Sequence, residues 1–178
     1  MTSSAEQRAA KVKALILDVD GVLTDGGLWY GPGGEAKLFN VRDGHGIVMA
    51  RLAGIKTAFL TGRSSEAMRR RATELKIDQV REGVVRKGEA LAELLSALGV
   101  TAEETCYAGD DLVDLPVLRK VGFPATVADA VPEVRAAAVF VTTAGGGHGA
   151  VRELVECILR AKGVWSGMVE RHEQEQYG

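Results

Sequence analysis

The chain has 178 residues, which is enough for one domain (1–178) around a single hydrophobic core. Its net charge of −2 and its aromatic content of only 5% argue against a nucleic-acid-binding protein. No apolar stretch is long enough to span a bilayer, and the first 14 residues lack the apolar centre of a signal peptide. We therefore expect a cytoplasmic protein that does not bind membranes.

Short apolar runs alternate with helical patterns along the chain. The predicted strands are residues 13–19, 56–60, 79–82, 105–108, 123–127 and 139–142. The predicted helices are residues 46–53, 64–75, 87–98, 112–120, 132–137 and 149–161. Residues 1–12 are predicted to be a poorly ordered N-terminal segment or a short helix. The polar tail, 163–178, is predicted to be disordered or to contact another subunit. This alternation predicts an α/β fold, a Rossmann-like doubly wound parallel sheet with helices on both faces.

A hairpin is predicted directly after the first strand, at about residues 27–40. Its strands would be residues 28–30 and 37–40, joined by the glycine- and proline-rich segment 31–34. Such a hairpin could overhang the end of the first strand as a flap. Two strands alone are barely stable in water, so we expect this hairpin to pack against something.

Two carboxylates follow the first strand, in the run DVDGVLTDG. Asp18 and Asp20 start on the same side of the strand, and Gly21 then allows the backbone to turn and to approach a ligand closely. Carboxylates this close repel each other unless one is protonated or a cation lies between them. A hard divalent cation with oxygen ligands is the simplest solution.

Other polar residues follow the predicted strands in the same way. Thr61 follows the strand at 56–60, and Asp110 follows the strand at 105–108. In open parallel sheets, ligands bind at the carboxyl ends of the strands. We therefore expect Asp18, Asp20, Thr61 and Asp110 to lie together at one edge of the sheet.

The spacing D-x-D-G-x-x-T-D, followed in order by Thr61, Lys87 and the segment Gly109-Asp110-Asp111-x-x-Asp114, resembles the haloacid dehalogenase superfamily of phosphotransferases. The resemblance implies that Asp18 is a nucleophile that forms an aspartyl-phosphate. It implies that Asp20 protonates the leaving oxygen and then activates water, while Thr61 and Lys87 bind the phosphoryl oxygens.

The same resemblance implies a magnesium site. Its ligands would be Asp18, the backbone carbonyl of Asp20, and Asp110. Asp111 and Asp114 would lie in the outer shell or act as further ligands. Magnesium would shield the phosphate charge from the carboxylate that attacks it.

The sequence has little room for the cap domain that many members of this superfamily carry. Only the hairpin and one helix lie between Asp25 and Thr61, and only one short strand lies between Leu75 and Lys87. An uncovered site must either accept large substrates or be closed by another subunit.

The runs KLFNVRDGHGI, AFLTGR, GDDLVDLPVL and GGGHGAVRELVECIL bring the resemblance closer to one capless family, the 3-deoxy-D-manno-octulosonate 8-phosphate phosphatases. Those enzymes act on a sugar acid phosphate in lipopolysaccharide biosynthesis. This similarity implies a homotetramer in which four hairpins form a central barrel. It also implies that Arg63, Asn40 and Arg42 lie near the substrate; an arginine offers a planar fork of donors to the sugar carboxylate.

The sequence departs from this family at two histidines. His148 stands where many relatives have arginine, and His45 where they often have tyrosine or leucine. We interpret both as partly exposed loop residues and His172 as a solvated tail residue. Two alternatives remain open. One is a phosphatase for nonulosonate 9-phosphates. The other is a non-catalytic oligomerisation domain like those fused to acylneuraminate cytidylyltransferases.

Overall fold

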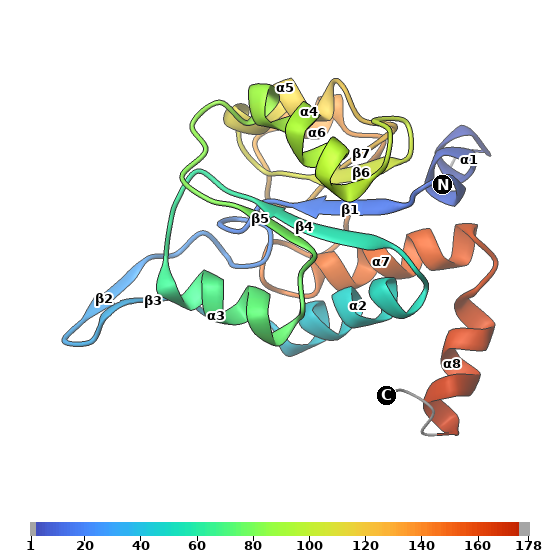
Figure 1. The fold of residues 1–178 in the computed structure, drawn as a ribbon, viewed down its shortest axis with the longest axis horizontal. Coiled ribbons are helices and arrows are strands. Elements are labelled where there is room, and N and C mark those ends of the chain that lie inside the picture. The colour runs from blue at the N-terminus through green and yellow to red at the C-terminus, as the bar shows by residue number, and fades with distance from the viewer. Residues whose placement is uncertain (1–2, 175–178) are drawn as a thin grey trace.

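The computed structural model describes residues 3–174. Its centre is a six-stranded parallel sheet with the strand order β5-β4-β1-β6-β7-β8 (Figure 1). The strands are β1 (Ala14–Leu17), β4 (Lys56–Leu60), β5 (Gln79–Arg81), β6 (Thr105–Ala108), β7 (Phe123–Thr126) and β8 (Phe140–Val141). The predicted parallel α/β sheet is therefore confirmed. The four residues of β1 and of β6 are all buried, as expected for central strands of such a sheet.

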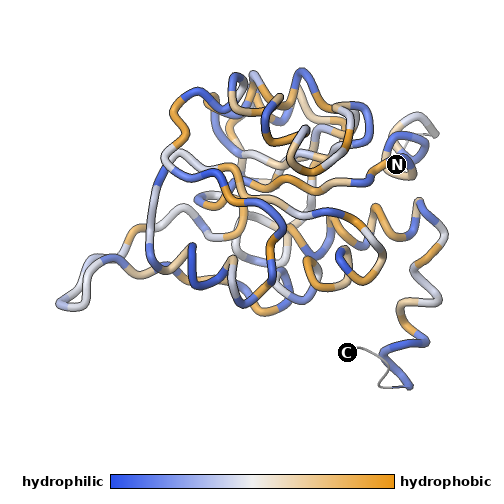
Figure 2. Tube along the Cα trace, viewed as in Figure 1, coloured by the Kyte–Doolittle hydropathy of each residue, from blue (hydrophilic) through white to orange (hydrophobic). Residues whose placement is uncertain are grey.

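Helices cover both faces of the sheet (Figure 1). On one face lie α2 (Val41–Leu52), α3 (Glu66–Glu74) and α7 (Ala150–Ala161); on the other lie α4 (Lys87–Leu98), α5 (Leu115–Leu118) and α6 (Pro132–Ala137). The chain begins with α1 (Ser3–Ala10) and closes with α8 (Trp165–Glu173). Hydrophobic residues gather in the strands and on the helix faces that cover them (Figure 2). No segment between these elements is large enough to form a cap domain.

Helix α2 begins five residues earlier than predicted. Asn40 caps it, because its side chain accepts a hydrogen bond from the backbone N–H of Arg42 at 2.8 Å. Gly44 and Gly46 favoured a loop in the sequence, since glycine is a poor helix former. In the fold they are contact points: a Cβ on Gly44 would lie 2.0 Å from Nη2 of Arg71, and one on Gly46 would lie 3.1 Å from Cα of Arg152.

The hairpin is shorter than predicted, and its second strand is shifted. It consists of β2 (Trp29–Gly31) and β3 (Gly34–Ala36), paired so that Gly31 faces Gly34. The prediction of a strand at 37–40 was wrong, because a two-residue turn starts the return strand at once. The chain then leaves the ladder: Lys37 turns to Asp20, and Asn40 caps α2. The hairpin projects from the same end of the molecule as the carboxyl end of β1 (Figure 1).

The segment after β6 is also more broken than the single predicted helix. A 3₁₀ turn, η1 (Leu112–Asp114), precedes the short α5. Asp111 and Asp114 form a capping box at the start of this turn, each side chain bonding to the other residue's backbone N–H. The capping box fixes the direction in which the acidic segment leaves β6.

Part of the predicted tail is a helix. In α8, Met168 is buried, and the guanidinium of Arg160 lies 4.5 Å from the centre of the Trp165 ring. The prediction for His172 was wrong: it is half-buried, and its Nε2 lies 3.0 Å from Nε2 of His45, in α2. The rest of the predicted tail, 175–178, lies outside the described residues.

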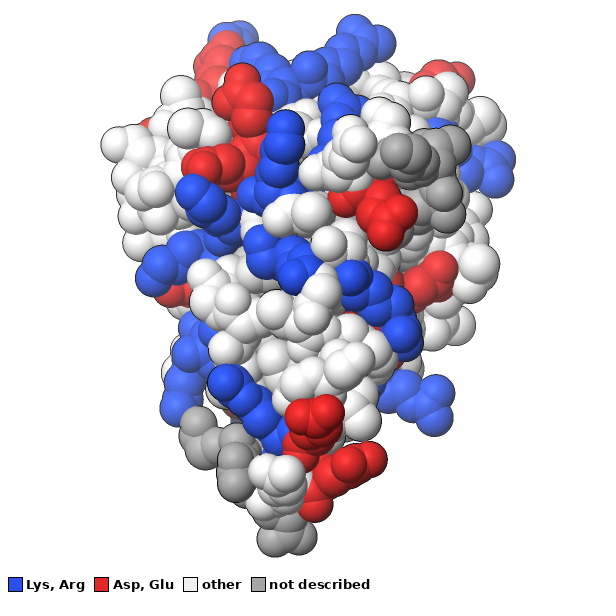
Figure 3. All heavy atoms as spheres, turned by 90° about the vertical axis from the view of Figure 1, so that its right-hand side faces the viewer, with Lys and Arg blue, Asp and Glu red and all other residues white. Residues whose placement is uncertain are grey.

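The end of the molecule that carries α1 and α8 is shown in Figure 3. Lysine and arginine side chains are interspersed there with aspartate and glutamate, which fits the small net charge. Among residues 3–174, no helix combines the length and the apolar composition needed to cross a bilayer.

Candidate active site

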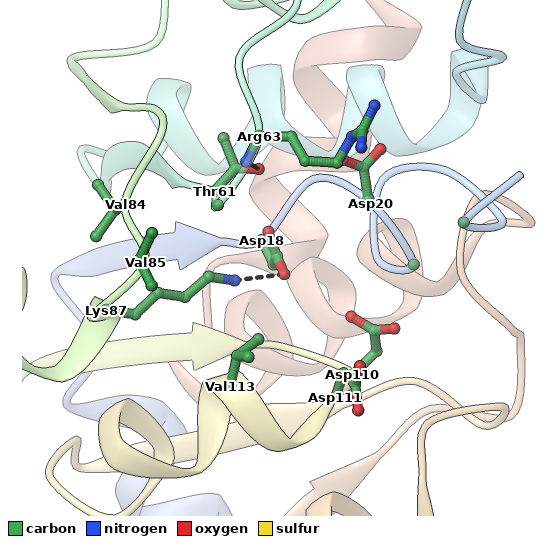
Figure 4. A pocket seen from close by; sticks show the side chains of 13 residues that line it. Asp18, Asp20, Thr61, Arg63, Val84, Val85, Lys87, Asp110, Asp111 and Val113 are labelled. Atoms are coloured by element: carbon green, nitrogen blue, oxygen red, sulfur yellow. Dashed lines mark hydrogen bonds and ion pairs between the residues drawn. The ribbon is translucent and has the colours of Figure 1, made fainter. Parts of the chain in front are cut away.

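A cleft of about 470 Å³ opens at the carboxyl ends of the central strands (Figure 4). This is where a doubly wound sheet binds its ligands. Its floor and walls come from the segments that follow β1, β4, β5 and β6. The lining residues are Asp18, Asp20, Gly21, Gly26, Thr61, Gly62, Arg63, Val84, Val85, Lys87, Asp110, Asp111 and Val113. The structure thus brings together the four strand-end residues that the sequence singled out, together with Lys87.

Lys87, Asp18 and Asp114 form the inner charged cluster of the cleft. Lys87 is the first residue of α4, and its Nζ lies 2.5 Å from Oδ2 of Asp18 and 2.7 Å from Oδ1 of Asp114. Its side chain is 2% exposed, and those of Asp18 and Asp114 are 9% and 0% exposed. Buried charges of this kind require pairing, so the position of each of the three depends on the other two. The dashed line in Figure 4 marks the contact of Lys87 with Asp18.

Both carboxylate oxygens of Asp114 accept hydrogen bonds from neighbouring residues. Besides Lys87, its Oδ1 accepts a hydrogen bond from the Tyr107 hydroxyl at 2.5 Å. Its Oδ2 accepts from the backbone N–H groups of Asp110 and Asp111, at 2.9 and 3.1 Å. Asp114 therefore fixes the loop that carries Asp110. Tyr107 was not singled out in the sequence, where it looks like one more buried residue of β6.

The inner cluster shifts the protonation equilibria of its members. Burial raises the pKa of Asp18 to about 6, with Lys87 opposing and Asp114 reinforcing this rise. Burial and the charge of Asp18 raise the pKa of Asp110 to about 7. Burial alone would lower the pKa of Lys87, but Asp18 and Asp114 raise it above its ordinary value. The cluster therefore holds more negative charge than one lysine balances.

This excess of negative charge fits a hard cation. Oxygens of Asp18, Asp110 and Asp114 lie within 4.8 Å of one another, and carboxylate oxygens are the ligands that Mg²⁺ prefers. Because Asp114 already accepts four hydrogen bonds, Asp18 and Asp110 are the carboxylates with capacity to spare. The carboxylate of Asp110 lies over Gly21, where a Cβ would be 2.0 Å from its Oδ2. Asp111, which is exposed, caps η1.

A glycine loop supports the turn that carries Asp20. A Cβ on Gly146 would lie 2.0 Å from the carbonyl oxygen of Gly21, and the backbone N–H of Gly147 donates to the carbonyl of Val22 at 3.0 Å. Asp43, which is buried in α2, accepts from the backbone N–H groups of Gly149 and Arg152 and so fixes the far end of this loop. The glycine loop was recognised in the sequence, but its packing against the turn that carries Asp20 was not predicted.

Asp20 belongs to a second, outer charged cluster with Lys37, Glu35 and Arg63. Lys37 pairs with Asp20 through Oδ1, and its Nζ lies 3.2 Å from Oε1 of Glu35. Arg63 pairs with Oε2 of Glu35 at 2.6 Å and approaches Oδ2 of Asp20 at 3.7 Å. In Figure 4, the Asp20 side chain points toward Arg63 and away from Lys87. Lys37 was missed in the sequence because it was assigned to a strand.

The remaining predicted residues divide into two groups. Thr61 is buried at the end of β4, and its Oγ1 accepts from the backbone N–H of Arg63 at 3.3 Å. Arg63 lines the cleft, whereas Asn40 and Arg42 are not among the lining residues of this chain. The side chain of Asn40 caps α2 and donates to the carbonyl of Gly147 at 3.2 Å. Arg42 is exposed on the first turn of α2.

Comparisons with known proteins show which family the chain resembles in sequence and in fold. Residues 79–154 match the family described as haloacid dehalogenase-like hydrolase. The chain is 44% identical to the 3-deoxy-D-manno-octulosonate 8-phosphate phosphatase of Escherichia coli K12, over 88% of this chain and 84% of that protein.

Solved structures superpose closely. The crystal structure of the phosphatase of this name from Moraxella catarrhalis, in complex with a magnesium ion, a phosphate ion and a KDO molecule, has a TM-score of 0.93. It is 38% identical, with 97% of this chain and 99% of that chain covered. The Yersinia pestis phosphatase is 43% identical, with a TM-score of 0.90 and coverage of 93% and 90%.

Proposed function

Because the chain belongs to the 3-deoxy-D-manno-octulosonate 8-phosphate phosphatase family of haloacid dehalogenase-like hydrolases, we propose that it hydrolyses this keto sugar acid phosphate to the free sugar acid and phosphate. The observation that carries the proposal is the buried contact of Lys87 with Asp18 in the cleft. A carboxylate held there by a cation can attack a phosphorus atom and form a covalent intermediate.

The reaction takes place in two steps. An oxygen of Asp18 attacks phosphorus, the bond from phosphorus to the sugar oxygen breaks, and that oxygen takes a proton from the carboxylic acid of Asp20. Asp20, now a carboxylate, removes a proton from water as the water oxygen attacks phosphorus. The bond from phosphorus to Asp18 then breaks, which releases phosphate and restores both aspartates. General acid–base help of this kind is worth about 10²–10⁴ in rate.

Lys87 and Thr61 supply donors for the phosphoryl oxygens. The Lys87 ammonium lies at the floor of the cleft beside Asp18, and Thr61 lies at the end of the adjacent strand, β4. Donors fixed in advance stabilise developing charge without reorganising. Asp18, the backbone carbonyl of Asp20, and Asp110 would hold Mg²⁺, with Asp111 and Asp114 outside them. When bound, Mg²⁺ supplies the positive charge that allows one anion to attack another.

The sugar acid would occupy the mouth of the cleft. Arg63 lines that mouth and offers a guanidinium to the sugar carboxylate. Asn40 and Arg42 remain candidates for substrate contact only from outside the cleft of their own chain. The exposed Val85 and Val113, together with Val84, form an apolar rim where the carbon chain could pack. A nonulosonate 9-phosphate is not favoured, since the relatives named above are octulosonate enzymes.

The homotetramer is part of this proposal. Trp29 and Tyr30 on the hairpin are 60% and 66% exposed, and Leu38 is 81% exposed. Apolar side chains gathered in this way mark an interaction surface. Four hairpins packed around a symmetry axis would bury them and remove the free strand edges. The cytoplasmic location stays a prediction.

The proposal is tested by phosphate release from a panel of sugar acid phosphates. We expect the octulosonate 8-phosphate to give the highest kcat/KM in Mg²⁺, and we expect no turnover after Asp18→Asn, which removes the nucleophile with little change in volume. Activity of Asp18→Asn within a few-fold of the parent would overturn the mechanism. A folded, magnesium-loaded parent that releases no phosphate from any ester would instead favour the non-catalytic alternative.

A further inference from the structure

Lys37 is a buried lysine that the mechanism above does not use. Its side chain is 1% exposed, and its ammonium pairs with Oδ1 of Asp20 and, at 3.2 Å, with Oε1 of Glu35. A lysine beside an exposed hairpin would ordinarily extend into solvent, because removing an ammonium from water is costly unless carboxylates compensate for it. Asp20 and Glu35 supply that compensation for Lys37, so its position is tied to theirs.

The outer cluster is a closed ring of alternating charges. Lys37 joins Asp20 to Glu35, and Arg63 joins Glu35 to Asp20 from the other side, with Nη2 2.6 Å from Oε2 of Glu35 and Nε 3.7 Å from Oδ2 of Asp20. Arg63 also donates to the hydroxyl of Tyr30, in β2, at 3.3 Å. The ring therefore links the turn after β1 to both strands of the hairpin and to the end of β4.

The two oxygens of Asp20 are in different situations. Oδ1 pairs with Lys37. Oδ2 is shielded from solvent and has no hydrogen-bond partner among residues 3–174. Nε of Arg63 lies 3.7 Å from it, beyond hydrogen-bond distance, so Oδ2 is a buried acceptor left without a hydrogen bond, which requires an explanation. Asp20 lines the cleft, and Oδ2 is thus the oxygen that remains available for exchanging a proton with a bound substrate.

We propose that Lys37 is the positioning residue for Asp20: by fixing Oδ1, it presents Oδ2 to the leaving oxygen and then to water. This inference rests on the proposed function, because it assigns a role within the same site. Lys37 follows β3 directly, so the hairpin becomes part of the acid–base machinery rather than only a cover. A shift of the hairpin would then misplace the proton donor, and an error of about 1 Å in such a group can cost 10²-fold.

This role predicts a dependence on the leaving group. A sugar alkoxide is a poor leaving group and needs the proton from Asp20, whereas p-nitrophenolate leaves readily without one. Loss of the correct position of Asp20 should therefore slow the first step, the release of the leaving group, selectively for alkyl phosphates, whereas the attack of water in the second step is common to both classes. Loss of a merely structural contact would slow release of the leaving group from both classes of ester alike.

The experiment compares Lys37→Met with the parent and with Asp20→Asn, in Mg²⁺, on the octulosonate 8-phosphate, a simple alkyl phosphate and p-nitrophenyl phosphate. For Lys37→Met we expect kcat/KM on the alkyl esters, which reports only the steps up to release of the leaving group, to fall roughly 10- to 100-fold. We expect kcat/KM on p-nitrophenyl phosphate to fall by less than about 3-fold. Asp20→Asn should show the same selectivity with a larger loss, and Lys37→Arg should recover most of the lost activity.

Lys56→Met is the matched control, because Lys56 pairs with Asp78 at 3.2 Å on the surface, away from the cleft, and should leave both esters unaffected. An equal loss of kcat/KM on both esters would overturn the proposal, and so would an unchanged or increased kcat/KM on the alkyl esters. If Lys37→Met does not fold, Glu35→Gln removes the other carboxylate of the ring and should give a smaller loss with the same selectivity. Failure of the proposed function can be told apart from failure of the role of Lys37, because the parent protein itself would then be inactive on every ester.

Discussion

Two lysines with buried side chains each pair with two carboxylates, Lys87 in the cleft and Lys37 beside it, and they differ in the elements that position them. Lys87 begins α4, a helix fixed by the buried residues Leu91 and Leu94, and its partners are Asp18, directly after β1, and Asp114, in η1. Lys37 lies in the segment that connects β3 to α2, and its partners belong to the turn after β1 and to the hairpin. The inner cluster thus forms within the core, whereas the outer cluster depends on a hairpin with exposed side chains.

This difference separates two requirements of the reaction. In the proposed mechanism, the nucleophile Asp18 and the phosphate-binding Lys87 are fixed by the packing of a single chain. The proposed acid–base residue, Asp20, is placed through a two-stranded hairpin, which is only marginally stable by itself. We infer that assembly of the hairpins affects proton transfer more than it affects attack by Asp18.

Lys87→Met should have the largest effect, because it leaves Asp18 and Asp114 buried without their cation. We expect the free energy of unfolding to fall by roughly 3–5 kcal/mol and turnover to be lost on alkyl and aryl esters alike. Urea unfolding and single-turnover kinetics check both expectations. If Lys87→Met kept aryl phosphatase activity, the contrast between the two lysines would be wrong.

Gly146→Ala tests the support beneath the Asp20 turn. The new Cβ would meet the carbonyl oxygen of Gly21 at 2.0 Å, so this turn must shift, at a cost of about 1–3 kcal/mol and with a lower kcat. Gly167→Ala, in α8, is the control: among residues 3–174, no atom apart from its chain neighbours and the backbone of its own helix lies within 4 Å of the new Cβ, and the change should be neutral or slightly stabilising. Thermal unfolding and kcat are measured for both variants. If Gly146→Ala and Gly167→Ala changed them equally, Gly146 would not support the Asp20 turn.

Magnesium should stabilise the protein more at pH 8 than at pH 5. In chelator, Asp18 and Asp110 have pKa values of about 6 and about 7, above their ordinary value of 3.8. The folded chain therefore binds these protons more tightly than the unfolded chain, and this contribution is lost as the pH rises from 3.8, the ordinary pKa, to about 7. Mg²⁺ binds the ionised carboxylates and offsets the loss. Thermal melts across this pH range with Mg²⁺ or chelator test the sign; a pH-independent magnesium effect would contradict it.

The hairpin surface should control assembly. Trp29→Ser combined with Leu38→Ser removes two of its exposed apolar side chains and should prevent the proposed tetramer from forming, as measured by light scattering. We expect alkyl phosphatase activity to fall more than aryl phosphatase activity. Val141→Ser, at the edge strand β8, changes a side chain that is 40% exposed and should leave assembly intact. A fully active monomer would refute the link between assembly and acid–base catalysis.

The smallest effect is expected at α8, far from the hairpin. Burial, together with the charges of His172 and Arg152, lowers the pKa of His45 below 6.5. The folded state thus disfavours protonation of His45. As the pH falls below 6.5, protonation of His45 should therefore weaken the contact of α8 with α2. Hydrogen exchange in α8 should increase a few-fold at pH 5.5, and His172→Gln should remove this dependence. Unchanged exchange across this range would contradict the expectation.

The sequence predicted the elements that have a strong local pattern. The helix at 87–98 was predicted with its bounds, because buried leucines recur at helical spacing and Gly99 ends it with a φ of 69°. The end of α2 was predicted within one residue, but its start was not, since Gly44 and Gly46 are there to allow close packing by Arg71 and Arg152. Local propensity cannot anticipate such a contact between helices.

The sequence by itself was enough to predict that Asp18, Thr61 and Asp110 lie together. Each of them follows an apolar strand, and a parallel sheet gathers its strand ends at one edge. Only the tertiary structure decided the contacts between segments with no local signal: Lys37 at Asp20, Tyr107 at Asp114, and His45 at His172, which is 127 residues away. The physical reason is that periodicity reports which side of an element is buried. Which side chain it meets there is set by packing among all the elements at once.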